Sequence, residues 1–284
     1  MTGVLYLVAT PIGNLGDMSI RAAQTLEDAD FIAAEDTRVT RKLLEHLNIK
    51  KHLLSYHEHN SRESGEKIIS RLLTGENCAL VTDAGTPIIS DPGERLVSSC
   101  IDAGVQIVSI PGPCAAITAL ALSGLPAGRF TFEGFLSTAR KSRFERLSEL
   151  KSEKRTMIFY EAPHKLKQTL KDFFEIFGNR RISISRELTK IYEETIRMTL
   201  SDAVAYYEQN QPRGEFVLII EGAFDEHDPE SGLQQAVAIV NSRIGEGSTL
   251  KDAVKEAADE TGISKNAIYN AAITNSEPQT RDSE

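Results

Sequence analysis

The sequence is poor in the residues that build disulfide, metal and membrane structures. It has no tryptophan and three cysteines, Cys78, Cys100 and Cys114, which lie far apart and form no CxxC pair. This spacing excludes a structural zinc site and indicates reduced thiols in a cytoplasmic protein. No apolar run reaches about 18 residues, so no transmembrane helix is expected. The first residues lack a basic segment followed by a long apolar stretch, and they predict a strand rather than a signal peptide.

Acidic residues outnumber basic ones, but the excess is confined to the end of the chain. The formal net charge is −9, while residues 221–284 alone hold 13 acidic and 5 basic side chains. The body of the chain is therefore close to neutral, and its charge does not argue against a nucleic-acid partner. Within the body, a basic segment runs from Arg140 to Arg155. This segment is either a contact with an RNA backbone or a solvated helix face.

Apolar runs alternate with amphipathic stretches, which predicts an α/β fold. Strands are expected at 4–9, 31–35, 78–82, 105–110, 130–135, 156–160, 182–185, 193–198 and 215–220. Helices are expected at 19–29, 38–47, 64–73, 93–103, 114–122, 143–150, 164–177, 201–209, 233–244, 249–260 and 264–274. A breaker cluster follows Gly124 and marks a boundary. The sequence thus predicts two α/β domains, 1–124 and 125–224. Residues 225–284 are expected to be an acidic linker at 225–231, a small helical appendage and a disordered tail from 275.

Three loops follow strands of the first domain and are rich in glycine and proline. They are 10–17, 82–93 and 110–115. Because ligands of open parallel sheets bind beyond the carboxyl ends of the strands, these loops form a candidate site. Gly85 permits close approach of the backbone to a ligand. The alternative is a set of rigid connections without a ligand. None of the loops contains GxGxxG or GK[ST], which disfavours a dinucleotide-binding fold and a P-loop NTPase.

Isolated polar residues allow two interpretations each. Glu35 and Asp36 precede Arg38 at a strand end, where they are either site residues or members of a structural salt bridge. The pair His57 and His59 has no evident third metal ligand and indicates a solvated loop more than a metal site. His164 is expected to lie at the start of a helix, which is a more common role for such a residue than catalysis.

Ten segments in order, from about residue 3 to residue 222, resemble the bacterial 16S rRNA cytidine 2′-O-methyltransferases, a branch of the tetrapyrrole-methylase superfamily. The segments are LYLVATPIGNLGD (5–17), AAEDTR (33–38), SYHEHN (55–60), TDAGTPIISDPG (82–93), PGPCAA (111–116), SGLP (123–126), FEGF (132–135), YEAPHK (160–165), RELTKIYEE (186–194) and GEFVLII (214–220). They are spread, in this order, over about three-quarters of the chain.

The resemblance implies a homodimeric enzyme that uses S-adenosyl-L-methionine (SAM), bound between the two α/β domains, to methylate a cytidine ribose of the 30S ribosomal subunit. The implied SAM contacts are Pro11, Asp83, Gly85, Thr86, Pro87, Ile88, Ile89, Ser90, Asp91, Pro111, Gly112, Cys114, Ala115, Tyr160, Glu161, Ala162, Gly214 and Glu215.

The chemistry also needs a base and contacts to RNA, because a ribose hydroxyl is a poor nucleophile. Candidates for the base are Glu35, Asp36, Asp83, Glu187 and Lys190. Arg38 and Arg186 are candidates for holding phosphates or the developing alkoxide. We expect RNA contacts at Arg140, Lys141, Arg143 and Arg146, and we expect no metal ion.

The chain departs from the family at Cys114, where relatives usually have serine, and after Phe135, where the basic residues come two or three positions later than usual.

Two further functions stay open. A uroporphyrinogen or precorrin methylase on the same fold is the nearest alternative. Residues 258–268 fit a helix-turn-helix pattern, which suggests a DNA-binding regulator, although Lys265 is the only cation of its second helix.

Overall fold

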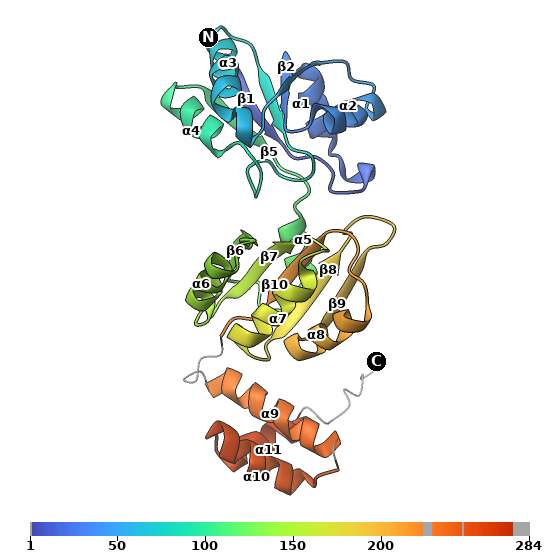
Figure 1. Cartoon of the computed structure of the whole chain (residues 1–284), viewed down its shortest axis with the longest axis vertical. Helices are drawn as coiled ribbons and strands as arrows, with labels where there is room; N and C mark the ends of the chain where they lie inside the picture. The colour runs from blue at the N-terminus through green and yellow to red at the C-terminus, as the bar shows by residue number, and fades with distance from the viewer. Residues whose placement is uncertain (1, 224–228, 246, 275–284) are drawn as a thin grey trace, which may run out of the picture. The chain divides into compact units, whose positions relative to one another are not determined.

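The computed structural model describes residues 2–223, 229–245 and 247–274. These residues form two compact units. One consists of Met1–Lys151 and Arg155–Glu221 and holds both β-sheets, and the other consists of Ser152–Lys154 and Gly222–Glu284 and holds three helices (Figure 1). In the part of the chain that the structure describes, no helix is long and apolar enough to cross a membrane.

The first sheet is parallel throughout, with strand order β3-β2-β4-β1-β5. Its strands are β1 (Val4–Val8), β2 (Phe31–Ala34), β3 (His52–Ser55), β4 (Cys78–Val81) and β5 (Gln106–Ile110). Helices α3 (Ser61–Leu73) and α4 (Glu94–Asp102) cover one face, and α1 (Ile20–Asp28) and α2 (Thr37–His46) cover the other. Because successive strand residues point to opposite faces, both cores are built from the same short strands.

The second sheet is mixed, as predicted, with strand order β6-β7-β10-β8-β9. Strands β6 (Phe130–Phe135) and β7 (Thr156–Glu161) pair in parallel. Strands β8 (Arg181–Arg186), β9 (Glu194–Thr199) and β10 (Phe216–Ile220) pair antiparallel. The main core lies under α6 (Arg140–Leu150), α7 (Leu166–Phe177) and α8 (Leu200–Gln209).

The opposite face of the second sheet is covered by α5 (Ala115–Ser123). The sequence placed this helix before the predicted boundary, and Gly124 ends it in the left-handed conformation, as expected of a C-cap. Its buried Ala116, Ala119 and Leu120 pack with strands β7 and β10. The packing of α5 therefore favours a domain boundary near Cys114, ahead of the predicted one. The division into three domains remains a prediction.

The second unit contains α9 (Pro229–Gly245), α10 (Leu250–Thr261) and α11 (Lys265–Thr274) around a small apolar core. Thr249 caps α10 at its start, and Gly262 ends it with a φ of 71°. The predicted linker 225–231 is partly wrong, because α9 already begins at Pro229. Residues 224–228 and the tail 275–284, predicted to be disordered, lie outside the described residues.

Candidate functional site

A cavity of about 540 Å³ opens at the carboxyl ends of strands of the first sheet and is closed by residues of the second. This volume is typical of small-molecule sites. Most of the predicted site residues line it: Glu35, Asp83, Gly85, Thr86, Ile89, Ser90, Asp91, Cys114, Ala115, Tyr160, Glu161, Ala162, Glu187, Lys190 and Glu215. The sequence missed Ile12, Ala84, Phe135, Pro163, Leu188, Phe216 and Val217, which also line it. These are mostly apolar residues of a kind that core packing explains equally well.

The other predicted contacts lie behind the lining. Pro11, Pro87, Ile88, Pro111, Gly112 and Gly214 do not line the cavity, and neither do Asp36 and Arg38. Gly112 allows two loops to meet, because a Cβ at this position would lie 2.9 Å from the Cβ of Ala9. The predicted roles of these residues in binding or catalysis stay predictions.

The three strand-end loops are tied to one another. Thr10 and Gly85 exchange two backbone hydrogen bonds of 2.9 and 3.0 Å, and the hydroxyl of Thr86 donates to the carbonyl oxygen of Pro113 at 3.0 Å. In the same loop, Ile88 and Ser90 have φ values of 79° and 65°. Residues other than glycine rarely adopt this backbone conformation. It costs about 1–3 kcal/mol per residue and occurs mainly at functional sites. The loop is therefore held in a strained shape against the cavity.

Three carboxyl groups share the first-sheet side of the cavity. Burial, followed by the charge of the nearby Glu35, raises the pKa of Asp91 to about 7. Burial, followed by the charge of Asp83, also raises the pKa of Glu35. The pKa of Asp83 is raised by burial, although its carboxylate accepts a hydrogen bond of 3.0 Å from the backbone N–H of Asp36. A carboxyl group with a pKa near 7 is suited to exchanging protons at neutral pH.

Asp36 and Arg38 form an exposed pair outside the cavity. The guanidinium of Arg38 lies 2.6 Å from the carboxylate of Asp36, and its side chain is 85% exposed. The hydrogen bond from Arg38 lowers the pKa of Asp36 to about 2. This geometry favours the structural salt bridge over a role in proton transfer. Arg186 is likewise paired, with Glu194 at 2.7 Å.

A second charged group lies on the other wall. Lys190 Nζ lies 3.0 Å from Glu187 Oε1 and 2.9 Å from Glu215 Oε2. Burial lowers the pKa of Lys190, but the bonds to the two carboxylates more than offset this, so that it is raised. The aliphatic stem of Lys190 occupies the space beside Gly13, where a Cβ would lie 2.4 Å from the Cγ of the lysine. Lys190 thus fills the gap between a loop of the first sheet and the wall formed by the second.

Two lining residues at the end of β7, Glu161 and Tyr160, are fixed in place by hydrogen bonds. The buried carboxylate of Glu161 accepts hydrogen bonds from the backbone N–H of Ala162 at 2.8 Å and from the hydroxyl of Thr169 at 2.5 Å. The hydroxyl of Tyr160 accepts from the backbone N–H of Ala116 at 3.2 Å, and burial raises its pKa to about 12. Phe135 packs on the ring of Tyr160 with centroids 5.5 Å apart.

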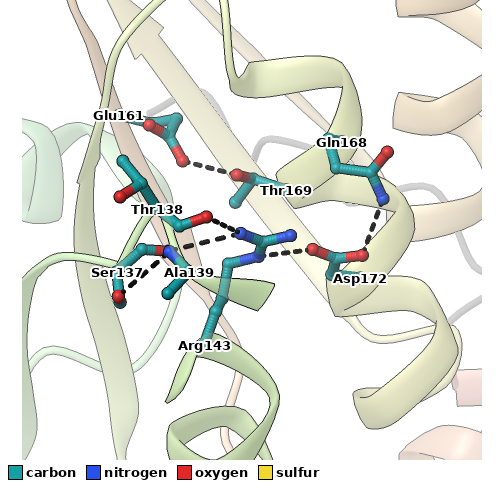
Figure 2. A network of polar contacts seen from close by, with 8 residues as sticks. All are labelled: Ser137, Thr138, Ala139, Arg143, Glu161, Gln168, Thr169 and Asp172. Atoms are coloured by element: carbon teal, nitrogen blue, oxygen red, sulfur yellow. Dashed lines mark hydrogen bonds and ion pairs between the residues drawn. The ribbon is translucent and has the colours of Figure 1, made fainter. Parts of the chain in front are cut away.

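The same helix α7 that carries Thr169 also anchors a predicted RNA contact. Figure 2 shows Arg143 pointing toward Asp172, with Nε 2.6 Å from the carboxylate. Its guanidinium also donates to the carbonyl oxygens of Ser137 and Thr138. The Arg143 side chain is only 12% exposed and that of Asp172 only 1%. Arg143 therefore joins α6, α7 and the segment after β6, and its donors are directed inward.

The remaining predicted RNA contacts differ in whether acidic side chains already pair with them. Arg146 pairs with Glu133 at 2.7 Å and with Glu149 at 2.8 Å. Lys141 is highly exposed and lies 3.9 Å from Glu145, and Arg140 is exposed with its guanidinium over the ring of Phe144. Of the four predicted RNA contacts, Arg140 and Lys141 remain the better placed for a phosphate.

The histidine pair has a structural explanation. His57 begins a 3-10 helix (Glu58–Asn60), where its backbone N–H donates to the side chain of Asn60 at 2.8 Å. Its ring lies edge-on to that of His59, with centroids 6.0 Å apart. Within the described ranges, no group of three or more His, Cys, Asp or Glu side chains is placed to hold a metal ion.

Comparison with known proteins identifies the class of this fold and site. The family model for tetrapyrrole (corrin/porphyrin) methylases matches residues 4–204, and the model for the RsmI C-terminal HTH domain matches residues 246–276. The chain therefore belongs to the tetrapyrrole (corrin/porphyrin) methylase family, which confirms the resemblance found in the sequence. The second match agrees with the helix-turn-helix pattern of the tail.

Within this family, the chain is similar to proteins named ribosomal RNA small subunit methyltransferase I. The protein of that name from Halalkalibacterium halodurans is 50% identical, with 94% of each chain covered. The one from Bacillus subtilis is 48% identical over 95% of this chain and 94% of its own. A solved uroporphyrin-III-C-methyltransferase from Thermus thermophilus matches with a TM-score of 0.56 and 19% identity, over 77% of this chain and 94% of its own. At that identity the likeness concerns the fold alone.

Proposed function

We propose that this protein transfers a methyl group from SAM to the ribose 2′-oxygen of cytidine 1402 in 16S rRNA of the small ribosomal subunit. The observation that carries the proposal is the carboxylate-lined cavity at the strand ends. The chain that forms it is 42–50% identical, over nearly its full length, to proteins named ribosomal RNA small subunit methyltransferase I. The tetrapyrrole alternative has no comparable support, since the likeness to the solved uroporphyrin-III-C-methyltransferase concerns the fold alone. The DNA-binding alternative rests on the helix-turn-helix match of the C-terminal helices, of which α11 carries a single cation.

The residues of the cavity fit SAM, a methyl donor with a sulfonium and an ammonium group. Six carboxyl groups and one ammonium group line the cavity: Glu35, Asp83, Asp91, Glu161, Glu187, Glu215 and Lys190. A partly enclosed cavity of this charge attracts cations, because the field of the carboxylates is weakly screened there. Tyr160, Phe135 and Val217 supply apolar walls for an adenine ring. When bound, SAM supplies the electrophilic methyl group.

The chain's own residues then position the hydroxyl and accept its proton. Methyl transfer is an in-line displacement, so alignment by the tied strand-end loops contributes much of the rate. Asp91, Glu35 and Asp83 are the carboxyl groups of the lining whose raised pKa values suit proton acceptance at neutral pH. Lys190, held by two carboxylates, is placed to donate a hydrogen bond toward developing negative charge. Asp36 and Arg38 lie outside the cavity and are assigned a structural role.

The partners follow from this substrate. The enzyme acts on rRNA or on the 30S subunit in the cytoplasm, and it works as a homodimer, as the family resemblance implies. The exposed Arg140 and Lys141 contact the RNA backbone. The acidic helical unit serves as an appendage for docking rather than as a reader of DNA, because α11 offers a phosphate only Lys265.

The test is transfer of labelled methyl from SAM to 30S subunits taken from cells that lack the modification. Naked 16S rRNA and uroporphyrinogen III are assayed alongside. Label on a cytidine 2′-oxygen is the expected result, and its position is read by nuclease digestion and mass spectrometry. Label on the tetrapyrrole alone would overturn the proposed substrate while leaving the fold and the methyl donor in place. Failure of the protein to bind SAM would overturn the proposal altogether.

A further inference from the structure

The turn between β8 and β9 exposes two apolar side chains beside the cavity. Ile191 is 94% exposed and Tyr192 is 73% exposed, the largest values among the exposed hydrophobic residues of this turn and of the second sheet. Three residues of the same turn, Glu187, Leu188 and Lys190, line the cavity. The exposed pair thus directly follows the lining residue Lys190 in sequence.

The turn is tightly bonded rather than loose. The backbone N–H of Lys190 donates to the carbonyl of Glu187 at 3.0 Å, and that of Glu193 donates to the carbonyl of Lys190 at 3.1 Å. The carboxylate of Glu193 accepts from the backbone N–H of Thr189 at 2.5 Å. Glu187 and Thr189 have φ values of 49° and 66°, a conformation that is costly for side chains. A strained, internally bonded turn that keeps Ile191 and Tyr192 in solvent calls for an explanation other than chain flexibility.

The chemistry of the site points to the occupant. Six carboxyl groups and one ammonium group line the cavity, so RNA phosphates are repelled from it, whereas the uncharged ribose and base of a nucleotide are not. Two side chains on one turn offer far less than the roughly 800 Å² per partner of a stable protein interface. A single base is matched in size to one tyrosine ring, and stacking on aromatic side chains is the general way in which unpaired bases are held.

We propose that Tyr192, supported by Ile191, is the stacking platform for the target base, which it holds outside the cavity while its ribose reaches the rim. This rests on the proposed function. Because the hydroxyl and the base belong to one nucleotide, fixing the base fixes the approach of the 2′-oxygen. Tyr192 is therefore a substrate-positioning residue, and it has no part in binding the methyl donor.

The test compares Tyr192→Ala, Tyr192→Phe and Tyr192→Leu. Removal of the ring in the alanine variant is expected to raise KM for 30S subunits by about tenfold or more, as loss of one stacking contact predicts. The phenylalanine variant should stay within about twofold of the parent, because it keeps the ring. The leucine variant should resemble alanine, because it keeps apolar area without an aromatic face. The dissociation constant for SAM should be the same in all three. Tyr206→Ala, which removes an exposed tyrosine of α8, is the matched control and should leave KM unchanged.

A second readout separates this proposal from the proposed function. RNA of the target sequence with the fluorescent analogue pyrrolo-cytidine at the target position can be followed optically, and the chain has no tryptophan to interfere. Stacking predicts quenching by the parent protein and by Tyr192→Phe, and loss of quenching in Tyr192→Ala. If the parent methylates 30S subunits but KM and quenching do not depend on the ring, the platform is wrong and the function stands. If quenching depends on the ring but no methyl is transferred, the function is wrong and the platform stands. A change of Tyr192→Ala from dimer to monomer in light scattering would instead assign this turn to an interface between copies and overturn the platform.

Discussion

Gly214 leaves the space that the side chain of Glu187 fills. A Cβ at position 214 would lie 2.5 Å from Cγ of Glu187 and 2.6 Å from its Oε1. The same Oε1 accepts the backbone N–H of Glu215 at 3.2 Å and lies 3.0 Å from Nζ of Lys190. One missing side chain therefore fixes the position of the Glu187 carboxylate and, through it, that of Lys190.

Gly214→Ala should displace Glu187 and misplace Lys190, lowering kcat/KM for 30S methylation by tenfold or more. It also forces alanine into a φ of 84°, which costs about 1–2 kcal/mol of stability. Gly104→Ala is the control, because Gly104 has a φ of 71° and open space where its Cβ would lie. The control should lose stability in thermal unfolding but keep its activity. Equal losses of activity in both variants would mean that backbone strain, not the position of Glu187, is responsible.

The raised pKa of Asp91 predicts that SAM binds more tightly as pH rises toward neutrality. Below pH 7 the carboxyl group carries a proton, which must be released for the carboxylate to favour a cationic ligand. The dissociation constant measured by calorimetry should fall as pH rises from 5.5 to 7.5, by at most about tenfold per pH unit for one proton. Buffers of different ionisation enthalpy should reveal proton release. Asp91→Asn should abolish the pH dependence, and a parent protein with flat affinity would contradict the assignment.

The Asp91 carboxyl group should also lower the folding stability as pH rises, whereas it should strengthen SAM binding. The pKa of Asp91 is about 7 in the folded protein and near 3.8 when unfolded, so the folded protein binds more protons between these values. Its contribution to the free energy of unfolding therefore falls as pH rises from about 4 to 7. In chemical denaturation without SAM, Asp91→Asn should gain stability relative to the parent as pH rises through this window. A difference between the two proteins that does not change with pH would contradict the pKa.

Arg143→Ala should destabilise the protein strongly, because it leaves the Asp172 carboxylate buried without its partner. Removing one member of a buried pair costs about 3–5 kcal/mol. Lys67→Ala breaks a pair with Glu63 in which both side chains are mostly exposed, 60% and 77%, and should cost less than about 1 kcal/mol. Urea unfolding of the two variants decides between them. A small effect of Arg143→Ala on stability, combined with a large effect on RNA affinity, would restore Arg143 as an RNA contact.

The double variant Arg140→Ala with Lys141→Ala should behave in the opposite way. Both side chains are exposed, so the free energy of unfolding should change little. If they contact phosphates, the affinity for RNA falls, and the slope of log affinity against log salt drops by about 2. Filter binding over a salt series measures both quantities. An unchanged slope would assign these residues to a solvated helix face.

Much of this architecture could be predicted from the sequence, because buried parallel strands appear as short apolar runs. Strand β3 (His52–Ser55) could not, since it has four residues, lies at the edge of the sheet and follows two lysines. Ser19, the first residue of the helix predicted at 19–29, caps α1, and its hydroxyl accepts the backbone N–H of Ala22. Such local signals are contained in a few consecutive residues, so they can be recognised in the sequence without knowledge of the fold.

The site was predictable where it follows from topology and not where it depends on distant pairing. The strand-end loops carry their own signature of glycine and proline, and they meet as expected. Arg143 looked like one of several cations on an exposed helix, and only the tertiary fold reveals Asp172, 29 positions away, as its partner. The apolar wall residues Phe135 and Leu188 look the same in sequence whether they line a cavity or fill a core.

The carboxylate-lined cavity also bears on how the spent cofactor leaves. Donation of the methyl group turns a positively charged sulfonium into a neutral thioether, so the by-product, S-adenosylhomocysteine, carries one positive charge fewer than the molecule that entered. The six acidic side chains that attract the donor hold the by-product less strongly. The reaction thus weakens the electrostatic attraction between the cavity and its own by-product.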